Sequence, residues 1–294
     1  MPNEPTEHPA WQLTTDLDGF LDRAEEFLHS EPALHTVLLG VAETLRVRGP
    51  RTYGDGVPLF GTCADADGAV RGAFVQTPPR RINLGPVAPE AAEALARQLA
   101  DVGPDLPGVA SEQATAEAFA RAWGECTGAA VALGKSQRLY RLGTLTPPGP
   151  APAGRARVAT AADRDLLASW HEEFGEAVGE RSVMEPGVWA DSRIAYGGAT
   201  LWEDPEGTPV ALAGATRRIA GQVRVTPVYT PAAFRGRGYG GAATVAVTRA
   251  ALDAGASEVL LFTDLANPTS NGLYRRIGYR PVGDFAQWEF GGQA

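Results

Sequence analysis

Little cysteine and little histidine occur in this sequence. Two cysteines, Cys63 and Cys126, and four histidines are spread over 294 residues, without a Cys-x-x-Cys pair or a Cys/His cluster. Structural metal sites and redox motifs need close-set ligands or thiols. We therefore expect no metal site, and we expect both thiols to be buried and reduced.

A long apolar run is also missing. The most apolar patch near the start, TVLLGVA at residues 36–42, is far shorter than the ~18 residues that a membrane-spanning helix needs. The first residues, MPNEPTEHPAW, carry acids and prolines where a secretory signal would carry positive charge and then an apolar stretch. We expect a cytoplasmic protein without a membrane partner.

Basic residues are fewer than acidic residues in this sequence. Lys and Arg together number 26 against 35 Asp and Glu, which gives a formal net charge of -9. Nucleic-acid binding depends largely on neutralising phosphates with Lys and Arg, so this balance argues against a nucleic-acid partner. The acidity would suit a cationic substrate, or would simply keep the protein soluble.

The length of the chain is more natural for two domains than for one. The segment TPPGPAPAGR, residues 146–155, concentrates Pro, Gly and Ala and can continue neither a helix nor a central strand. We predict a first domain over residues 1–145, a linker over 146–155 and a second domain over 156–294.

Alternating helix and strand patterns in the second domain indicate an α/β fold. A helical pattern covers residues 161–178, and its apolar face carries Leu166, Leu167, Trp170, Phe174 and Val178. The patterns that follow predict a helix near 184–194, strands within 198–203, 209–219 and 221–230, a glycine-rich loop with a helix, a strand at 258–264, a short helix, and closing strands at 279–285 and 286–290.

The short helix has clear boundaries in the sequence. Asn267 is a good N-cap, Pro268 occupies the first helical position, and Gly278 stands where a C′ glycine ends a helix.

The first domain repeats this order of elements. In place of the glycine loop it has GPVAPEAAEAL, without arginine or close-set glycines, so a duplicated first half would have lost the phosphate loop. The predicted elements are helices at 16–29 and 33–47, strands at 57–65 and 68–77 joined by an Asp-Gly turn, a strand at 80–87, a helix at 89–101, a strand at 108–110, a helix at 111–124, and closing strands at 130–137 and 138–145.

The glycine loop from Gly236 to Gly241 spells G-x-G-x-x-G between a strand and a helix. Such a turn presents backbone amides and the positive end of a helix dipole to an anion. A dinucleotide site would begin directly after the strand and would be followed by an acid about 20 residues later. Here the segment 231–235 intervenes and Asp264 lies further on, so the context argues against a dinucleotide.

Read as Arg235-x-x-Gly238-x-Gly240 after a strand ending VYTP, the loop resembles the pyrophosphate-binding motif of the GNAT superfamily of acyl-CoA N-acyltransferases. The run LFTDLANPTSNGLYRRIGYRPV, residues 261–282, resembles the next motif of that superfamily, in the expected order and spacing. The sequences of both motifs are most similar to those of the glycine-N-acyltransferase-like branch. The resemblance is closest over 220–290 and rests on element order alone over 1–145.

The resemblance implies a tandem arrangement of two GNAT-like domains with a degenerate N-terminal half. Each would be a mixed, mostly antiparallel sheet flanked by helices, an α/β (α+β) fold. It also implies acetyl-CoA, or another acyl-CoA, as the acyl donor, with the pantetheine between two splayed strands and the pyrophosphate on the loop amides. The implied cofactor-binding residues are Val228, Tyr229, Thr230, Arg235, Gly236, Arg237, Gly238, Tyr239, Gly240, Gly241, Asn267, Ser270 and Asn271.

Several of these residues have a second interpretation. Asn267 would cap its helix and bond the pantetheine amide at once. Ser270 and Asn271 would face the same groove, or would form an ordinary first turn of a helix. The loop itself could be a glycine-rich surface turn with solvated arginines.

Tyr274 is the candidate catalytic acid. Acyl transfer to an amine expels a thiolate, and a phenol of pKa ~10 can donate a proton as that charge develops. The alternative is a core aromatic beside Leu273 and Ile277.

The base is less clear, because the strand GQVRVTPVYT carries no carboxylate. Either water channels carry the proton, or an acid comes from the first helices of the second domain, where Glu173, Glu176 and Glu180 lie. We name Glu176 as the candidate, with a charged solvent face as the alternative interpretation.

These features predict an N-acetyltransferase that moves an acetyl or other acyl group to a primary amine by direct attack, since neither cysteine lies near the motifs. The alternatives are a non-catalytic acyl-CoA-binding module and a nucleotide-linked oxidoreductase. The acceptor class stays open among amino acids, polyamines, antibiotics, peptide termini and protein lysines. The first domain would shape the acceptor pocket or the interface between domains.

Overall fold

The chain divides into two units. The computed structural model describes residues 10–103, 106–179 and 184–291. The N-terminal unit contains Met1–Gln137 together with Gly283–Ala294, and the C-terminal unit contains Arg138–Val282. This division differs from the linear one expected from the sequence, because the segment 146–155 connects two strands of the C-terminal unit and the end of the chain belongs to the N-terminal unit.

From its first helix onward, the N-terminal unit follows the predicted order of helices and strands; the strand that precedes this helix was not predicted. Its elements are β1 (Trp11–Thr14), α1 (Leu17–Ser30), α2 (Thr36–Arg48), the 3-10 helix η1 (Pro50–Tyr53), β2 (Leu59–Ala64), β3 (Val70–Gln76), β4 (Ile82–Leu84), α3 (Pro89–Val102), β5 (Gly108–Glu112), α4 (Gln113–Thr127) and β6 (Val131–Leu142).

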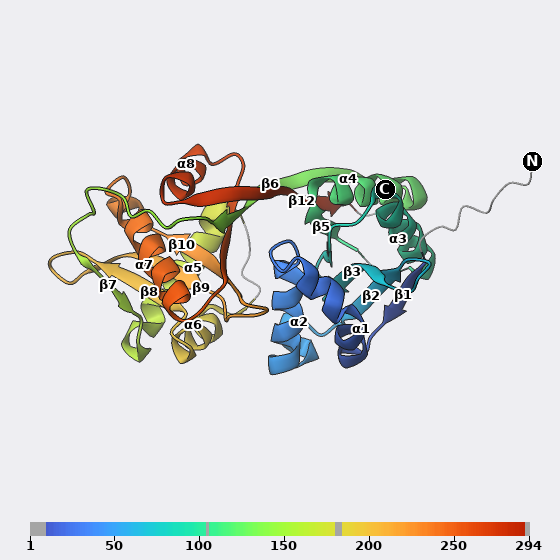
Figure 1. Ribbon diagram of the computed structural model, residues 1–294, viewed down its shortest axis with the longest axis horizontal. Helices are drawn as coiled ribbons and strands as arrows, with labels where there is room; N and C mark the ends of the chain where they lie inside the picture. Colours follow the sequence, from blue (N-terminus) through green and yellow to red (C-terminus); the bar gives the residue numbers. More distant parts are fainter. Residues whose placement is uncertain (1–9, 104–105, 180–183, 292–294) are drawn as a thin grey trace, which may run out of the picture. The chain divides into compact units, whose positions relative to one another are not determined.

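The C-terminal unit repeats that order (Figure 1). Its elements are β7 (Arg155–Val158), η2 (Ala161–Asp163), α5 (Arg164–Val178), α6 (Pro186–Ala195), β8 (Ala199–Glu203), β9 (Pro209–Ala215), β10 (Gln222–Tyr229), η3 (Ala232–Phe234), α7 (Tyr239–Asp253), β11 (Glu258–Asp264), α8 (Pro268–Arg276) and β12 (Tyr279–Phe290).

Both units contain a mixed, mostly antiparallel sheet, which confirms the predicted fold class. In the N-terminal unit the strand order is β1-β2-β3-β4-β5-β12-β6, with β4 and β5 parallel and β1–β2, β2–β3, β3–β4 and β5–β12 antiparallel. In the C-terminal unit the order is β12-β6-β11-β10-β9-β8-β7, with β10 and β11 parallel and β7–β8, β8–β9 and β9–β10 antiparallel.

The two long strands correct the sequence-based interpretation. The closing strands predicted at 130–137 and 138–145 form one strand, β6, and those predicted at 279–285 and 286–290 form one strand, β12. The predicted breaks are wrong because the chain stays extended through both positions. The unit boundaries nevertheless fall within these strands, after Gln137 and after Val282, so each strand serves both sheets.

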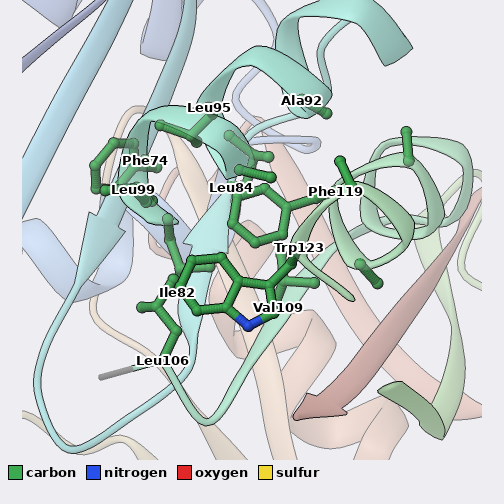
Figure 2. Close-up of a cluster of buried hydrophobic side chains, with 14 of the residues drawn as sticks. Phe74, Ile82, Leu84, Ala92, Leu95, Leu99, Leu106, Val109, Phe119 and Trp123 are labelled. Carbon is green, nitrogen blue, oxygen red and sulfur yellow. The ribbon is translucent and has the colours of Figure 1, made fainter. Parts of the chain in front are cut away.

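The end of β12 completes the N-terminal unit. Residues Phe285–Glu289 pair antiparallel with β5, and the ring of Phe290 stacks on Trp123 with centroids 5.6 Å apart. Trp123 belongs to the main core cluster of this unit, which Figure 2 shows gathered over β4 and β5. The N-terminal sheet and core therefore depend on residues from the other end of the sequence.

Two apolar clusters lie against the C-terminal sheet. One joins α7 and α8 to β9, β10 and β11, and includes Ala213, Val225 and Tyr274. The other joins α5 and α6 to β8, β9 and β10, and includes Trp170, Trp189 and Leu212. Since Leu212 and Ala213 are neighbours on one strand, the two clusters cover opposite faces of the sheet.

Of the two cysteines, only Cys63 is buried as expected. Cys126 is exposed in the last turn of α4, so the prediction of two buried thiols is wrong for this residue. No helix in the described part of the chain is long and apolar enough to cross a bilayer.

An ion-pair network ties the start of α5 to the sheet. The guanidinium of Arg157 donates two hydrogen bonds to the Asp163 carboxylate, at 2.7 and 2.8 Å, and a third to Glu203. Asp163 also accepts a hydrogen bond from the amide of Thr160 at 2.7 Å. The Arg157 hydrogen bonds lower the pKa of Asp163 to about 2.

We expect Asp163→Asn to lower the apparent melting temperature at pH 7 by about 5 °C, because it removes the carboxylate that accepts two hydrogen bonds from Arg157. The folded-state pKa of Asp163 lies below its ordinary value of 3.8. Its stabilisation is therefore present above pH ~4 and is lost as pH falls toward ~2, so the difference between variant and wild type should shrink over that range. Thermal unfolding at several pH values measures this. Asp165→Asn is the matched control, because that side chain is 97% exposed; equal melting temperatures of Asp163→Asn and wild type at pH 7 would contradict the expectation.

Ending the chain after Val282 removes the half of β12 that pairs with β5. We expect the amides of Gly108–Glu112 to lose protection in hydrogen-exchange mass spectrometry, because β5 loses its antiparallel neighbour. Peptides that cover β8 and β9 serve as the internal control. Unchanged exchange at β5 would show that the N-terminal unit does not need the end of the chain.

Candidate acyl-CoA site

The site begins where β10 and β11 stop pairing. Their parallel register joins Gln222–Arg224 to Glu258–Leu260, whereas β10 continues to Tyr229 and β11 to Asp264. On its other side β10 stays paired with β9 as far as Tyr229 opposite Leu212. Beyond Arg224 the edge of β10 that faces β11 is therefore not used by that strand, which is the splayed arrangement that the sequence resemblance implied.

A β-bulge in β10 reverses which face its side chains occupy. Val225 pairs with Ala215 and the next registered pair is Val228 with Ala213, so β10 has one residue more than β9 between them. Val225 and Val228 both contact the cluster under α7, whereas Tyr229 joins the cluster under α5 and α6. A bulge re-aims the side chains that follow it, and here it directs Tyr229 toward α5.

The hydroxyl of Tyr229 donates a hydrogen bond to Oε2 of Glu173 at 2.6 Å. The Ser169 hydroxyl donates to the other carboxylate oxygen at 3.0 Å. Burial first, and then the Glu173 carboxylate, raise the pKa of Tyr229 to about 12, while the charge of Arg235 acts in the opposite direction. The phenol therefore stays protonated at neutral pH and remains the donor.

The glycine loop leads from β10 into α7. Gly236 and Gly238 have φ of 76° and 83°, which is the left-handed region that favours glycine. Gly238 is the N-cap of α7 and no side chain caps the helix. The first helical hydrogen bond runs from the amide of Ala242 to the carbonyl of Gly238 at 3.0 Å, so the amides of residues 239–241 have no helical acceptor.

Charge and close packing complete this loop. Arg235 and Arg237 are exposed, and Nε of Arg235 donates to the carbonyl of Thr230 at 3.0 Å, which fixes the loop to the end of β10. A Cβ on Gly240 would lie 3.0 Å from Oγ1 of Thr230, and one on Gly241 would lie 2.9 Å from Leu273. Free amides at a helix N-terminus beside two guanidiniums fit a phosphate group.

Helix α8 has the boundaries that the sequence predicts. Asn267 is the N-cap and its Oδ1 accepts a hydrogen bond from the amide of Ser270 at 3.0 Å. Pro268 occupies the first position, and Gly278 follows the helix with φ of 108°. The side chain of Ser270 is partly exposed.

The side chain of Asn271 makes its hydrogen bonds within the protein. Its Nδ2 donates to the carbonyls of Asp264 and Asn267, both at 2.8 Å, and its Oδ1 accepts from the Tyr140 hydroxyl at 2.9 Å. These bonds favour the structural interpretation of Asn271, in which it fixes α8 to the end of β11 and to β6.

Tyr274 is buried, with 7% of its surface exposed, and its ring packs edge-on against Tyr279 at 6.2 Å. Its hydroxyl makes no hydrogen bond within the described part of the chain, in contrast to that of Tyr279, which bonds Thr248 at 2.7 Å. Burial raises the pKa of Tyr274 to about 12. The group therefore keeps its proton at neutral pH, as a general acid must.

The candidate glutamates for the base differ in their surroundings. Glu176 is exposed and its side chain has no hydrogen bond among the described residues, whereas Glu173 is half-buried and bonded on both oxygens. Glu180 lies outside the described residues. Helical spacing could have separated the first two, because Glu173 lies on the flank of the apolar face and Glu176 lies nearly opposite it.

In the N-terminal unit, side chains of the protein hydrogen-bond the main chain just beyond the end of the parallel β4–β5 ladder, the position equivalent to the end of the β10–β11 ladder. The register of β4 and β5 ends at Asn83 and Ala110. Beyond it, the Ser111 hydroxyl donates to the carbonyl of Leu84 at 2.8 Å, and Oγ1 of Thr115 bonds both the carbonyl and the amide of Val87, at 2.9 and 3.1 Å. Three main-chain groups at this position, the carbonyls of Leu84 and Val87 and the amide of Val87, are therefore already hydrogen-bonded within the protein.

No group of three or more His, Cys, Asp or Glu side chains that could hold a metal ion occurs among the described residues.

Known structures share this fold along most of the chain. An acetyltransferase of the GNAT family from Colwellia psychrerythraea aligns over 96% of this chain and 99% of its own, with a TM-score of 0.61 and 10% identity. A Drosophila protein aligns over 97% and 100%, with a TM-score of 0.65 and 13% identity. A tandem GNAT protein from the clavulanic acid biosynthesis pathway aligns over 97% and 100%, with a TM-score of 0.55 and 11% identity.

At these identities the structural likeness concerns the fold, and no curated protein matches the sequence. A sequence-family model, described as the acetyltransferase (GNAT) family, matches residues 164–279. That range runs from the first residue of α5 to the start of β12 and contains the loop, α7 and α8. Most of the C-terminal unit thus matches the acetyltransferase (GNAT) family, in a chain that shares its fold with a tandem GNAT protein.

Proposed function

We propose that the C-terminal unit transfers an acetyl or other acyl group from acyl-CoA to a primary amine by direct attack. The observation that carries this proposal is the helix N-terminus of α7, with its uncapped amides beside Arg235 and Arg237, directly after the strand whose edge is left open. Acyl-CoA supplies the acyl group as a thioester. Because the sequences of both motifs resemble those of the glycine-N-acyltransferase-like branch, acyl-CoAs other than acetyl-CoA should also be tested as donors.

The residues of the loop and strand would share the binding of the donor. The amides of residues 239–241 and the two guanidiniums would hold the pyrophosphate. The main chain of Val228 and Tyr229, with that of Thr230, would hold the pantetheine, although the carbonyl of Thr230 is already bonded to Arg235. Asn267 and Ser270 would line the same path, and Asn271 would hold α8 in place.

Tyr274 would protonate the departing thiolate. Its hydroxyl is free of protein partners in the described chain, and its proton is retained at neutral pH because burial raises its pKa to about 12. A neutral phenol in a dry site can deliver its proton as negative charge develops on sulfur.

The N-terminal unit would not bind a second acyl-CoA. Ser111 and Thr115 occupy the main-chain groups at its equivalent position, and its segment before α3 carries no arginine. We propose that it has a structural or acceptor-shaping role.

Gly238→Asp tests the phosphate site. Aspartate tolerates the left-handed conformation and its carboxylate can cap α7, so the fold should persist while negative charge occupies the anion position. We expect the affinity for acetyl-CoA, measured by calorimetry, to fall by about 30-fold or more.

Gly68→Asp is the matched control, because Gly68 has a φ of 84° against 83° for Gly238, a Cβ there meets nothing within 4 Å, and it lies in the turn between β2 and β3 of the N-terminal unit. Equal affinity in Gly238→Asp and wild type would remove the loop from the site. Binding of NAD in place of acetyl-CoA would favour the oxidoreductase alternative, and binding without CoA release from any amine would favour the binding module.

For Tyr274→Phe we expect kcat to fall by about 100-fold with unchanged acetyl-CoA affinity, because only the proton donor is lost. Steady-state CoA release measures this. Tyr279→Phe is the control: it removes a neighbouring buried hydroxyl that bonds Thr248 and should lower stability without lowering kcat. A full-rate Tyr274→Phe enzyme would assign the tyrosine to the core.

A further inference from the structure

The carboxylate of Glu173 is held by two hydroxyl donors at the end of β10. Tyr229 donates to one oxygen at 2.6 Å and Ser169 to the other at 3.0 Å. A carboxylate offers about four acceptor positions, so two donors leave capacity for a further cation. Neither donor carries a positive charge, and the negative charge of Glu173 is therefore not neutralised by them.

The position of this carboxylate follows from the bulge in β10. Without the extra residue, Tyr229 would share the face of Val225, under α7, and could not reach α5. With it, Tyr229 stands on the face covered by α5 and α6 at the point where the open edge of β10 ends. The bulge thereby joins the donor-binding strand to an acid that the strand itself lacks.

Tyr274 belongs to the cluster on the opposite face of the sheet, with α7 and α8. Glu173, bonded to Tyr229, and the proposed thiolate acid thus lie on opposite faces of the sheet. Such a separation lets one group remove a proton while the other supplies one, without the two neutralising each other.

We propose that Glu173 binds the ammonium group of the acceptor and takes a proton from it, and that Tyr229 is the positioning residue that holds Glu173 at the end of β10. This inference rests on the proposed function and assigns its acceptor side. It names a cationic primary amine as the substrate class, rather than a hydroxyl or thiol, because a fixed carboxylate recognises an ammonium.

The step balances as follows. One N–H bond of the ammonium breaks, its proton moves to Glu173, and the nitrogen lone pair then forms the C–N bond at the thioester carbonyl carbon. The C–S bond breaks with its electron pair on sulfur, which takes the proton of Tyr274. A second nitrogen proton is released as the amide forms and replaces the proton that Tyr274 gave, while Glu173 returns its own to solvent.

The test compares Glu173→Gln with Glu176→Gln in the full-length protein. The probes are acetyl-CoA with spermidine, glycine, a lysine-containing tripeptide and kanamycin, and the readouts are CoA release and calorimetric acetyl-CoA affinity. For the amines that wild type accepts, we expect Glu173→Gln to lower kcat/KM about 100-fold with unchanged acetyl-CoA affinity. The matched control is Glu172→Gln, at another exposed position of the same helix, and it should stay within about 3-fold of wild type. Glu176→Gln, at the other candidate for the base, should lose less activity than Glu173→Gln.

Tyr229→Phe separates positioning from folding. We expect a loss of about 10-fold in kcat/KM. We expect the double variant Glu173→Gln, Tyr229→Phe to be no slower than Glu173→Gln alone, because both changes disrupt the same hydrogen-bonded pair. A merely structural role would make the two losses add.

Full activity of Glu173→Gln in an active enzyme would overturn this inference and leave the proposed function intact. A larger loss in Glu176→Gln than in Glu173→Gln would overturn it as well. Wild-type protein that does not bind acetyl-CoA would instead refute the proposed function, and the inference with it. Wild-type protein that binds acetyl-CoA but releases CoA with none of the amines would overturn the assignment of a cationic amine to Glu173.

Discussion

The parallel ladder between β10 and β11 ends at Arg224 and Leu260, and the rest of the site depends on that ending. Buried main-chain groups need partners, so an edge left open along β10 would suit the proposed acyl-CoA, whose pantetheine carries amides of its own. The glycine loop follows at the end of the same strand and adds the uncapped amides of α7. The early end of the β10–β11 ladder therefore places the open edge of β10, proposed for the pantetheine, next to the N-terminus of α7, proposed for the pyrophosphate.

The N-terminal unit shows the same break and a different outcome. Its β4–β5 ladder also stops early, but Ser111 and Thr115 supply the missing hydrogen bonds from within the protein. Two small hydroxyl side chains thus bond the Leu84 carbonyl and the carbonyl and amide of Val87. The two units thus share a topology, but only in the N-terminal unit do side-chain hydroxyls bond main-chain groups beyond the end of the parallel ladder.

Local chemistry made much of the C-terminal unit predictable. The boundaries of α8 follow from Asn267, Pro268 and Gly278, because cap and breaker residues act over a few positions. The strand at 258–264 and the order of elements in both halves follow from hydrophobic patterning in the same way. The continuity of β6 and β12 could not be predicted, because each strand is divided between two sheets and only long-range pairing keeps it extended.

The sequence by itself determined the glycine loop, the caps of α8 and the motif spacing that marks the family, since these depend on residues close together in the chain. Only the tertiary structure decided which glutamate meets β10 and where the last residues of the chain belong. The first depends on a bulge whose register exists only against β9. The second depends on β5, a strand far away in sequence that pairs with β12 through main-chain groups, and main-chain groups leave no mark on residue identity.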